Sequence, residues 1–269
     1  MQIVLSAVRV VFSLSLLLYA SWNDYKTREV TNKVWMVYAP IALGLTMTEL
    51  LLYETTNLYL FGASFGLTAI FSIILFYTGA FGGADSKALI CIALALPFFP
   101  SILLTPLLPG GASPLLQLIF PLTILSNGVL FAAATGIYML FRNLILGRGK
   151  RGKLFEGTLA KESIGKKFLV LITGYRFPVA KLKEKWHIFP MEDIEGNAES
   201  SVRKLVILPR EDGRGAIVER LSAAVKDGKI SDKVWATPGL PMLIFITAGL
   251  IIALIFGDIV WLIISSLFG

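Results

Sequence analysis

Two aspartates beside long apolar segments are the residues of this chain best suited to chemistry. Asp85 ends the glycine-rich turn 79–85 between two apolar runs, and Asp24 lies at a matching depth at the end of another run. A carboxylate carried toward the centre of a membrane costs roughly 2.5–3.5 kcal/mol, so such residues are rare without a role. Taken alone, Asp85 could simply be the N-cap of the next helix. The second aspartate favours a paired site.

A pair of carboxylates suits the chemistry of an aspartic protease. When two carboxyl groups share a site, one stays protonated and donates to the scissile carbonyl, while the ionised one activates water. No metal ion, cofactor or nucleophilic side chain is needed. The chain has one histidine and one cysteine, which disfavours a Ser-His site or a cysteine-cluster zinc site. We interpret Cys91 as a packing residue and His187 as part of a strand.

The composition predicts a membrane protein. Of the 269 residues, 55% are hydrophobic and 16% are charged, and the mean hydropathy is +0.74. A helix needs about 20 apolar residues to cross a membrane. Six such runs lie near residues 2–22, 34–52, 58–78, 86–106, 115–141 and 240–265. The first run lacks the basic start and the cleavage site of a signal peptide, so we assign it as a membrane helix.

The distribution of basic residues predicts the orientation in the plasma membrane. Of the 25 basic residues, all except Arg9 lie in the turns 23–33 and 79–87 or in the stretch 142–233. Because cytoplasmic segments collect Lys and Arg, the N-terminus is expected outside and both aspartates at the cytoplasmic face. The net charge of +7 then reflects topology and attraction to the lipid bilayer. No basic helix interleaved with aromatic residues suggests nucleic-acid binding.

Some polar residues of the apolar runs predict contacts between helices. Arg9 lies about 22 Å from the cytoplasmic end of its helix at 1.5 Å per residue. Glu49 reaches a similar depth on the next helix, so we predict a structural Arg9–Glu49 pair. Gly62 and Gly66 are typical of closely packed membrane helices. Asn127 is expected to form an interhelical hydrogen bond.

Two other residues of the late apolar runs have simpler interpretations. We expect Pro121 to kink the fifth helix. Asp258 falls near the outer end of the last run, and we interpret it as a solvated residue rather than a third acid.

Residues 147–233 have the composition of a small soluble domain, which can bury only a limited core. Short apolar, β-branched segments predict strands at 167–173, 185–190 and 201–208. Residues 216–225 have apolar positions three and four apart, which predicts an amphipathic helix.

The fold class that follows is a polytopic α-helical membrane protein with about six transmembrane helices. A small cytoplasmic α+β domain is expected between helices five and six. The predicted divisions are 1–146 for the first five helices, 147–233 for the soluble domain and 234–269 for the final helix.

Two motifs resemble the signatures of a known family, the type IV prepilin-like leader peptidases. Asp24-x-Lys26-x-Arg28-x-Val30-x-Asn32 is similar to the family's first-aspartate signature, and Gly82-Gly83-Ala84-Asp85-Ser86-Lys87 resembles its Gly-x-Gly-Asp-x-Lys motif. The stretch Thr237–Pro241 and the last helix look like the C-terminal region of the archaeal branch, which acts on preflagellins and other pilin-like precursors. The stretch 147–233 resembles nothing specific.

The resemblance implies a membrane aspartic endopeptidase with Asp24 and Asp85 as its catalytic residues. The residues implied to support them are Lys26, Arg28, Asn32, Gly82, Gly83, Ala84 and Lys87. The implied substrates are pilin-like or archaellin precursors with class III signal peptides, which lose a basic leader at the cytoplasmic membrane boundary. The cysteine-rich zinc-binding loop and the methyltransferase region of the bacterial enzymes are absent, so peptidase activity alone is expected, without a cofactor.

Ala84 departs from the family pattern, because it replaces the glycine just before the aspartate. The change matters if that position needs a positive φ or a close approach of the substrate backbone. We expect alanine to serve, since Gly82 and Gly83 remain available to form the turn.

Two other functions are compatible with membrane aspartates. A proton-coupled transporter uses such acids as relays, but usually near the midplane and within repeated halves, which this sequence lacks. A non-catalytic scaffold of a pilus or secretion assembly would use both aspartates only as caps.

Overall fold

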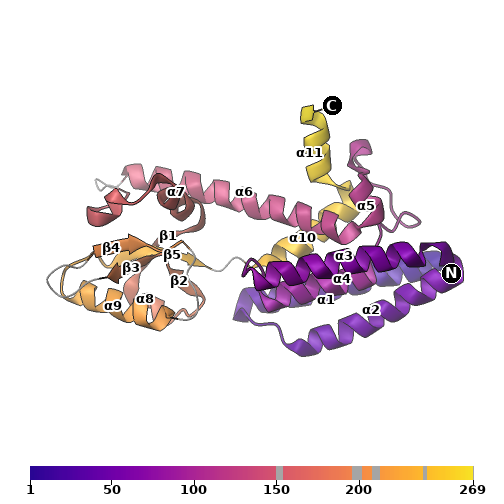
Figure 1. Ribbon diagram of the computed structural model, residues 1–269, viewed down its shortest axis with the longest axis horizontal. Helices are drawn as coiled ribbons and strands as arrows, with labels where there is room; N and C mark the ends of the chain where they lie inside the picture. Colours follow the sequence, from indigo (N-terminus) through magenta and orange to yellow (C-terminus); the bar gives the residue numbers. More distant parts are fainter. Residues whose placement is uncertain (150–153, 196–201, 208–212, 239–240, 269) are drawn as a thin grey trace. The chain divides into compact units, whose positions relative to one another are not determined.

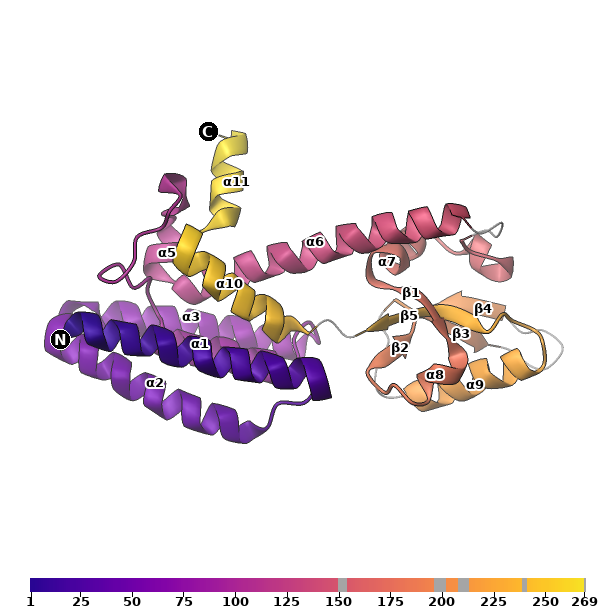
Figure 2. The same ribbon diagram turned by 180° about the vertical axis from the view of Figure 1, so that it is seen from behind.

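The structure is a computed structural model, and it describes residues 1–149, 154–195, 202–207, 213–238 and 241–268. The chain divides into two compact units. One is helical and consists of Met1–Ala132 and Pro241–Gly269, and the other contains the β-strands and consists of Ala133–Leu240. Figures 1 and 2 show the elements of each unit from opposite sides.

Long apolar helices make up the first unit. They are α1 (Gln2–Thr27), α2 (Asn32–Tyr53), α3 (Leu58–Tyr77), α4 (Gly83–Ala95), α10 (Met242–Phe256) and α11 (Ile259–Phe268). The unit also contains the short α5 (Pro114–Leu118), 3-10 turns at Thr55–Asn57 and Pro109–Gly111, and the first part of α6 (Phe120–Gly149), which continues into the second unit after Ala132. Within the described residues, four helices are long and apolar enough to cross a membrane, namely α1, α2, α6 and α3 with the turn before it. The bent pair α10–α11 is a fifth candidate. The chain is therefore a multi-pass helical membrane protein.

The predicted helix 86–106 is wrong over its second half. α4 ends at Ala95 because Pro97 lacks an N–H and disfavours the helical conformation at the residue before it. Leu96 accordingly has φ −133° and ψ 66°. The irregular backbone that follows finds partners in neighbouring helices, as it must within a membrane. The Ser64 hydroxyl, for example, donates to the Pro97 carbonyl at 2.9 Å.

The predicted helix 115–141 is two helices, α5 and α6. They are separated at Ile119, which has φ −144° and ψ 65°. Pro121 lies in the first turn of α6, where its missing N–H breaks no helical hydrogen bond. It therefore marks the beginning of a helix and does not kink one.

The last apolar run is also broken, because α10 and α11 meet at an angle of 63°. Gly257 makes the break with φ 85°. The Asn127 amide donates to the Gly257 carbonyl at 2.9 Å and accepts from the Ile259 N–H at 3.1 Å. The predicted interhelical hydrogen bond of Asn127 is thus confirmed, and it satisfies backbone groups that the break sets free.

Asp258 is not solvated, so that prediction was wrong. Its side chain is buried, and it accepts from the Ser113 hydroxyl at 2.6 Å and from the Trp261 N–H at 2.9 Å. The sequence did not reveal this role, because it follows from the break before α11. There the carboxylate bonds an N–H in the first turn of the new helix, as an N-cap residue does.

The core of the first unit lies between α1, α2, α4 and α10 (Figure 1). Helix α3 packs on α4 through small polar residues, and the Ser72 hydroxyl donates to the Ser86 carbonyl at 2.9 Å. The predicted packing role of Gly62 and Gly66 is wrong, because a methyl group added to either would meet no other atom within 4 Å. They lie on a different face of α3 from Ser64 and Ser72, which are buried.

The second unit is built on a three-stranded antiparallel sheet of order β1 (Tyr175–Pro178), β5 (Lys233–Pro238) and β2 (Ile188–Pro190). A second antiparallel pair joins β3 (Glu192–Glu195) to β4 (Val202–Leu205). Side chains alternate along β5, so Val234 packs with α8 (Val179–Leu182) and α9 (Arg214–Lys226). Trp235 packs in another cluster with α7 (Ile164–Thr173) and the turn Gly157–Lys161.

The predicted elements of this unit are partly confirmed. The helix at 216–225 is α9, and the strand at 201–208 contains β4, although residues 201 and 208 lie outside the described residues. The strand at 185–190 is confirmed only from Ile188, and His187 lies in the turn before it.

The strand predicted at 167–173 is wrong, because these residues form most of α7. A short apolar run does not by itself distinguish a strand from a helix. The helix begins earlier, after Ser163, whose hydroxyl accepts from the Lys166 N–H.

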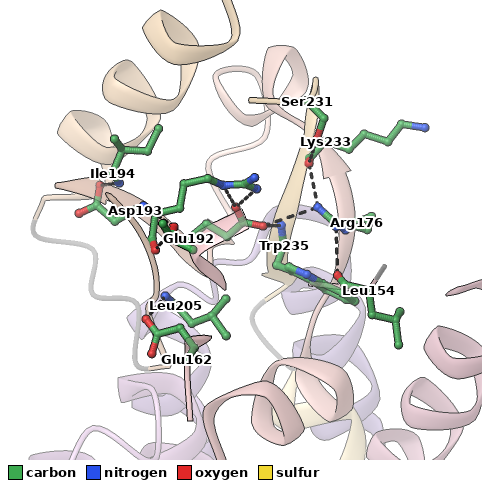
Figure 3. A network of polar contacts seen from close by, with 12 residues as sticks. Leu154, Glu162, Arg176, Glu192, Asp193, Ile194, Leu205, Ser231, Lys233 and Trp235 are labelled. Carbon is green, nitrogen blue, oxygen red and sulfur yellow. Dashed lines mark hydrogen bonds and ion pairs between the residues drawn. The ribbon is translucent and has the colours of Figure 1, made fainter. Parts of the chain in front are cut away.

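A buried carboxylate, Glu192, joins the strands of the second unit (Figure 3). It accepts from Arg203 Nη2 at 2.5 Å and from the Trp235 backbone N–H at 2.8 Å, and Arg176 Nη1 lies 3.8 Å away. The Glu192 side chain is fully buried. Burial lowers the pKa of Arg176, which also lies over the Trp235 ring. A buried carboxylate is tolerated here because each of its two oxygens accepts a hydrogen bond.

Glu192→Ala is therefore expected to destabilise the second unit by about 3–5 kcal/mol, since it leaves two arginines and a backbone N–H without their shared partner. Limited proteolysis of the full chain across a urea series would measure the loss. Glu195→Ala is the matched control, because Glu195 pairs with Lys204 at the exposed end of the same strand. Equal protease resistance of both variants would contradict a structural role for Glu192.

Candidate functional site

Asp24 lies in the last turn of α1, where Arg28 ends the helix. The Arg28 N–H donates to the Asp24 carbonyl at 3.0 Å. Among the described residues, Arg28 is the only non-glycine residue with a positive φ, 58°. That conformation costs a non-glycine residue about 1 kcal/mol or more, and such strain often occurs at functional sites. The Asp24 side chain is partly exposed and close enough to Arg28 to interact electrostatically.

Asp85 lies in the first turn of α4, and its carboxylate closes the turn before the helix. The N-cap is Gly82, whose N–H donates to Asp85 Oδ2 at 3.0 Å. Asp85 is thus the third helical residue, whose carboxylate bonds the N-cap backbone N–H as in one half of a capping box, and it is not the N-cap itself. The positive φ of the turn belongs to Gly79 (75°), whereas Gly82 has φ −71°.

Ala84 lies inside the first turn of α4. The only non-glycine residue with positive φ in the described parts of the chain is elsewhere, at Arg28. The backbone at position 84 therefore does not require glycine for its conformation. Whether the substitution alters activity stays a prediction.

The structure brings Asp24 and Asp85 together from different helices. The two carboxylates are close enough to interact electrostatically, and the backbone N–H of Leu243 also interacts with Asp85. Leu243 lies in the first turn of α10. The N-terminus of a helix carries a partial positive charge, which favours a carboxylate. α10 is therefore the third wall of the candidate site.

Contacts between α1 and α10 hold this third wall in place. The Ser21 hydroxyl donates to the Leu243 carbonyl at 3.0 Å and lies 2.8 Å from the Thr247 hydroxyl. Ser21 is one turn before Asp24, so the same end of α1 positions both the aspartate and α10. This role of Leu243 was not predictable from its residue type, because it belongs to a backbone amide. Pro241, just before α10, was the available sign of a helix start.

Two of the other predicted support residues, Asn32 and Lys87, contact each other, whereas Lys26 contacts a residue of its own helix. Lys87 Nζ donates to Asn32 Oδ1 at 2.7 Å, which joins α4 to the first residue of α2. Lys26 instead lies over the ring of Trp22, 4.5 Å from its centre. Thr31 is the N-cap of α2 but makes no side-chain capping bond. The two motifs are thus in contact through Asn32 and Lys87.

This arrangement supplies two carboxyl groups, a nearby guanidinium and backbone amides at one end of a helix bundle. Within the described residues, no group of three or more His, Cys, Asp or Glu side chains could hold a metal ion. Cys91 is a buried packing residue, as expected. Two neighbouring carboxyl groups can act as general acid and general base in hydrolysis.

The Arg9–Glu49 pair is confirmed, and it lies far along α1 from Asp24. Arg9 Nη1 donates to Glu49 Oε2 at 2.5 Å, and both side chains are buried. The Ser6 hydroxyl donates to the second Glu49 oxygen, and Arg9 Nε donates to the Ala95 carbonyl. Arg9 thereby satisfies a carbonyl at the end of α4. The pair borders a cavity of about 450 Å³ that the irregular segment after α4 also lines.

Two family models match the chain. The type IV leader peptidase family matches residues 11–141, which include Asp24 and Asp85. The archaeal peptidase A24 C-terminus type II matches residues 166–259, which include most of the second unit and α10. The expectation that 147–233 resembles nothing specific is therefore wrong.

Preflagellin peptidases of three archaeal species are similar to nearly the whole chain. Those of Methanococcus voltae and Methanococcus maripaludis are 29% and 25% identical to it, each over 90% of this chain and 92% of the relative. That of Methanocaldococcus jannaschii is 26% identical over 94% of this chain and 95% of the relative.

The buried Arg9–Glu49 pair gives a prediction about stability. Arg9→Met should destabilise the protein by about 3–5 kcal/mol, because it leaves the Glu49 carboxylate buried without its cation. Adding Glu49→Leu should restore most of the loss, since an apolar pair of similar volume removes the unpaired charge. Denaturant midpoints of the purified protein in detergent would measure both changes. A double variant no more stable than Arg9→Met would refute the pairing.

Proposed function

From the premise that this chain belongs to the type IV leader peptidase family, we propose that it is a membrane aspartic endopeptidase that removes the basic leader from archaellin or other pilin-like precursors. The observation that carries the proposal is the approach of Asp24 and Asp85 from α1 and α4, within the part of the chain that the family model matches. The names of the three similar preflagellin peptidases support the substrate class.

The proposed mechanism uses the two carboxyl groups as a unit. The ionised carboxylate takes a proton from water, which attacks the scissile carbonyl carbon while the protonated carboxyl donates to the carbonyl oxygen. Collapse of the tetrahedral intermediate breaks the C–N bond, and a carboxyl proton passes to the leaving amine. Gly82 and Leu243 fix the Asp85 carboxylate through their backbone N–H groups. Arg28 supplies positive charge beside Asp24.

The proposed topology has six membrane crossings, an external N-terminus and the active site at the cytoplasmic face of the plasma membrane. It is supported by the positions of the basic residues. A site at this boundary can reach the junction where a basic leader meets an apolar helix, which is how a class III signal peptide is built. Cleavage is expected at that junction, after a small residue such as glycine.

The division into a membrane domain (1–146), a cytoplasmic domain (147–233) and a final helix (234–269) also stays a proposal. In it, the cytoplasmic domain holds or selects precursors and takes no part in the chemistry. A transporter or a non-catalytic scaffold is not favoured by any comparison with similar proteins.

The roles of the two aspartates are tested by conservative substitutions. Asp24→Asn or Asp85→Asn removes one titrating carboxyl group with little change of shape, so either should lower cleavage of a precursor by more than 1,000-fold, roughly the loss seen for members of a catalytic unit. Glu29→Gln is the matched control, because Glu29 is exposed and only five residues from Asp24. Cleavage is followed by mass spectrometry in protein shown to be inserted and folded. Near-normal turnover by either Asn variant would leave the dyad proposal untenable.

The proposed orientation is tested by thiol labelling of intact cells. Cysteines at positions 56 and 110 should react with a membrane-impermeant reagent from outside, whereas one at position 150 should react only after lysis. The unsubstituted chain is the blank, because its one cysteine is buried. The reverse pattern would contradict both the orientation and the cytoplasmic location of the site.

A further inference from the structure

Helix α7 presents an apolar face that the protein does not cover. Ile164 is 84% exposed, Phe168 50% and Leu169 37%. Val170 is buried on the other side of the helix, and it packs with the partly buried Leu171 in the cluster around Trp235. A short helix that buries one apolar side in the protein and exposes another needs a second apolar environment.

The C-terminal end of α7 is fastened to a helix that can span the membrane. The Asn143 amide of α6 donates to the Leu171 carbonyl at 2.8 Å and to the Gly174 carbonyl at 2.7 Å. A methyl group on Gly136 would lie 3.9 Å from Ile172 Cβ, so the two helices touch there as well. Figures 1 and 2 both show α7 beside the C-terminal part of α6.

These contacts fix the depth of α7 in the membrane. The candidate span of α6 runs from Phe120 to Ile145. Its 26 residues are about 39 Å long at 1.5 Å per residue, which exceeds the hydrocarbon thickness of about 30 Å. Asn143 therefore lies near the end of the hydrocarbon layer. An element bonded to it is held at the level of the lipid headgroups.

Apolar residues of α6 continue the exposed face of α7 toward the bilayer. Ile172 follows Ile164 and Phe168 at intervals of four residues, so the three lie along one side of α7. Ile172 contacts α6 at Gly136. The neighbouring α6 residues Ile137 and Phe141 are 57% and 60% exposed, as expected of a surface in contact with lipid.

The charge around α7 matches an anionic surface. The sequence 142–167 contains eight basic residues and two acidic ones. In α7 itself, Lys166 pairs with Glu162 at 3.0 Å and Lys167 donates to the Ala160 carbonyl. Basic residues beside an inserted apolar face are typical of helices that lie on anionic membranes.

We propose that α7 is an interfacial helix that inserts Ile164, Phe168 and Leu169 into an anionic lipid leaflet and so anchors the second unit to the membrane surface. The occupant of the apolar face is the bilayer that α6 crosses. This inference does not rest on the peptidase activity, because it concerns only where α7 lies.

Spin labels on the full chain test the proposal. Ile164→Cys and Phe168→Cys are labelled with a nitroxide in nanodiscs that contain phosphatidylglycerol and one protein copy each. Labels at both positions should be several-fold more accessible to oxygen, relative to a water-soluble nickel chelate, than a label at Glu219→Cys. Glu219 is the matched control because it is exposed on α9, which packs with Val234 and not with Trp235. The unsubstituted chain, with its buried cysteine, should take no label.

The lipid arm of the experiment separates insertion from simple burial. Replacing phosphatidylglycerol with phosphatidylcholine should lower the accessibility to oxygen, relative to the nickel chelate, at positions 164 and 168. The same ratio at position 219 should not change. Equal accessibility at all three positions in phosphatidylglycerol would overturn the proposal. So would shielding that appears only when a precursor is added, which would assign the face to a protein partner. A ratio at 164 and 168 that is the same in both lipids would overturn the role of anionic headgroups.

Discussion

Every backbone N–H and C=O inside a membrane needs a partner, and this constraint governs how the helical unit is built. Helix α4 ends at Ala95, whose carbonyl accepts from Arg9, and the irregular chain after it is bonded by Ser64 through the Pro97 carbonyl. The break before α11 is satisfied in the same way by Asn127 and Asp258. Polar residues far from the aspartates thus hold together the helices that carry them.

The same constraint explains the geometry at the other end of the bundle. The first turn of α4 has free N–H groups, and Asp85 closes it through Gly82. α10 begins beside it, fixed to α1 by Ser21, and α1 ends in a strained turn at Arg28. Asp85 is therefore both a capping residue and a proposed catalytic acid. The two interpretations that the sequence set against each other are compatible in the structure.

The long helices, the Arg9–Glu49 pair and the interhelical role of Asn127 could be predicted from the sequence. The length of an apolar run and the depth of a residue in the membrane both follow from counting residues along one helix. Prediction failed where tertiary contacts decide the outcome. The buried state of Asp258 depends on a break after α10. The strand predicted at 167–173 is part of a helix that begins earlier, at Ile164. For the candidate site, the motifs identified Asp24 and Asp85, but the amide of Leu243 could be found only in the structure.

A double-mutant cycle on cleavage is the most direct test that Asp24 and Asp85 act as one unit. Single-turnover rates on a purified precursor are compared for the wild type, the two Asn variants and the variant that carries both substitutions. If the carboxyl groups work as a pair, the double variant should be no slower than the slower single variant, because the first substitution already disables the unit. A double variant slower by the product of the two single losses would show that the aspartates contribute independently, and would contradict the account.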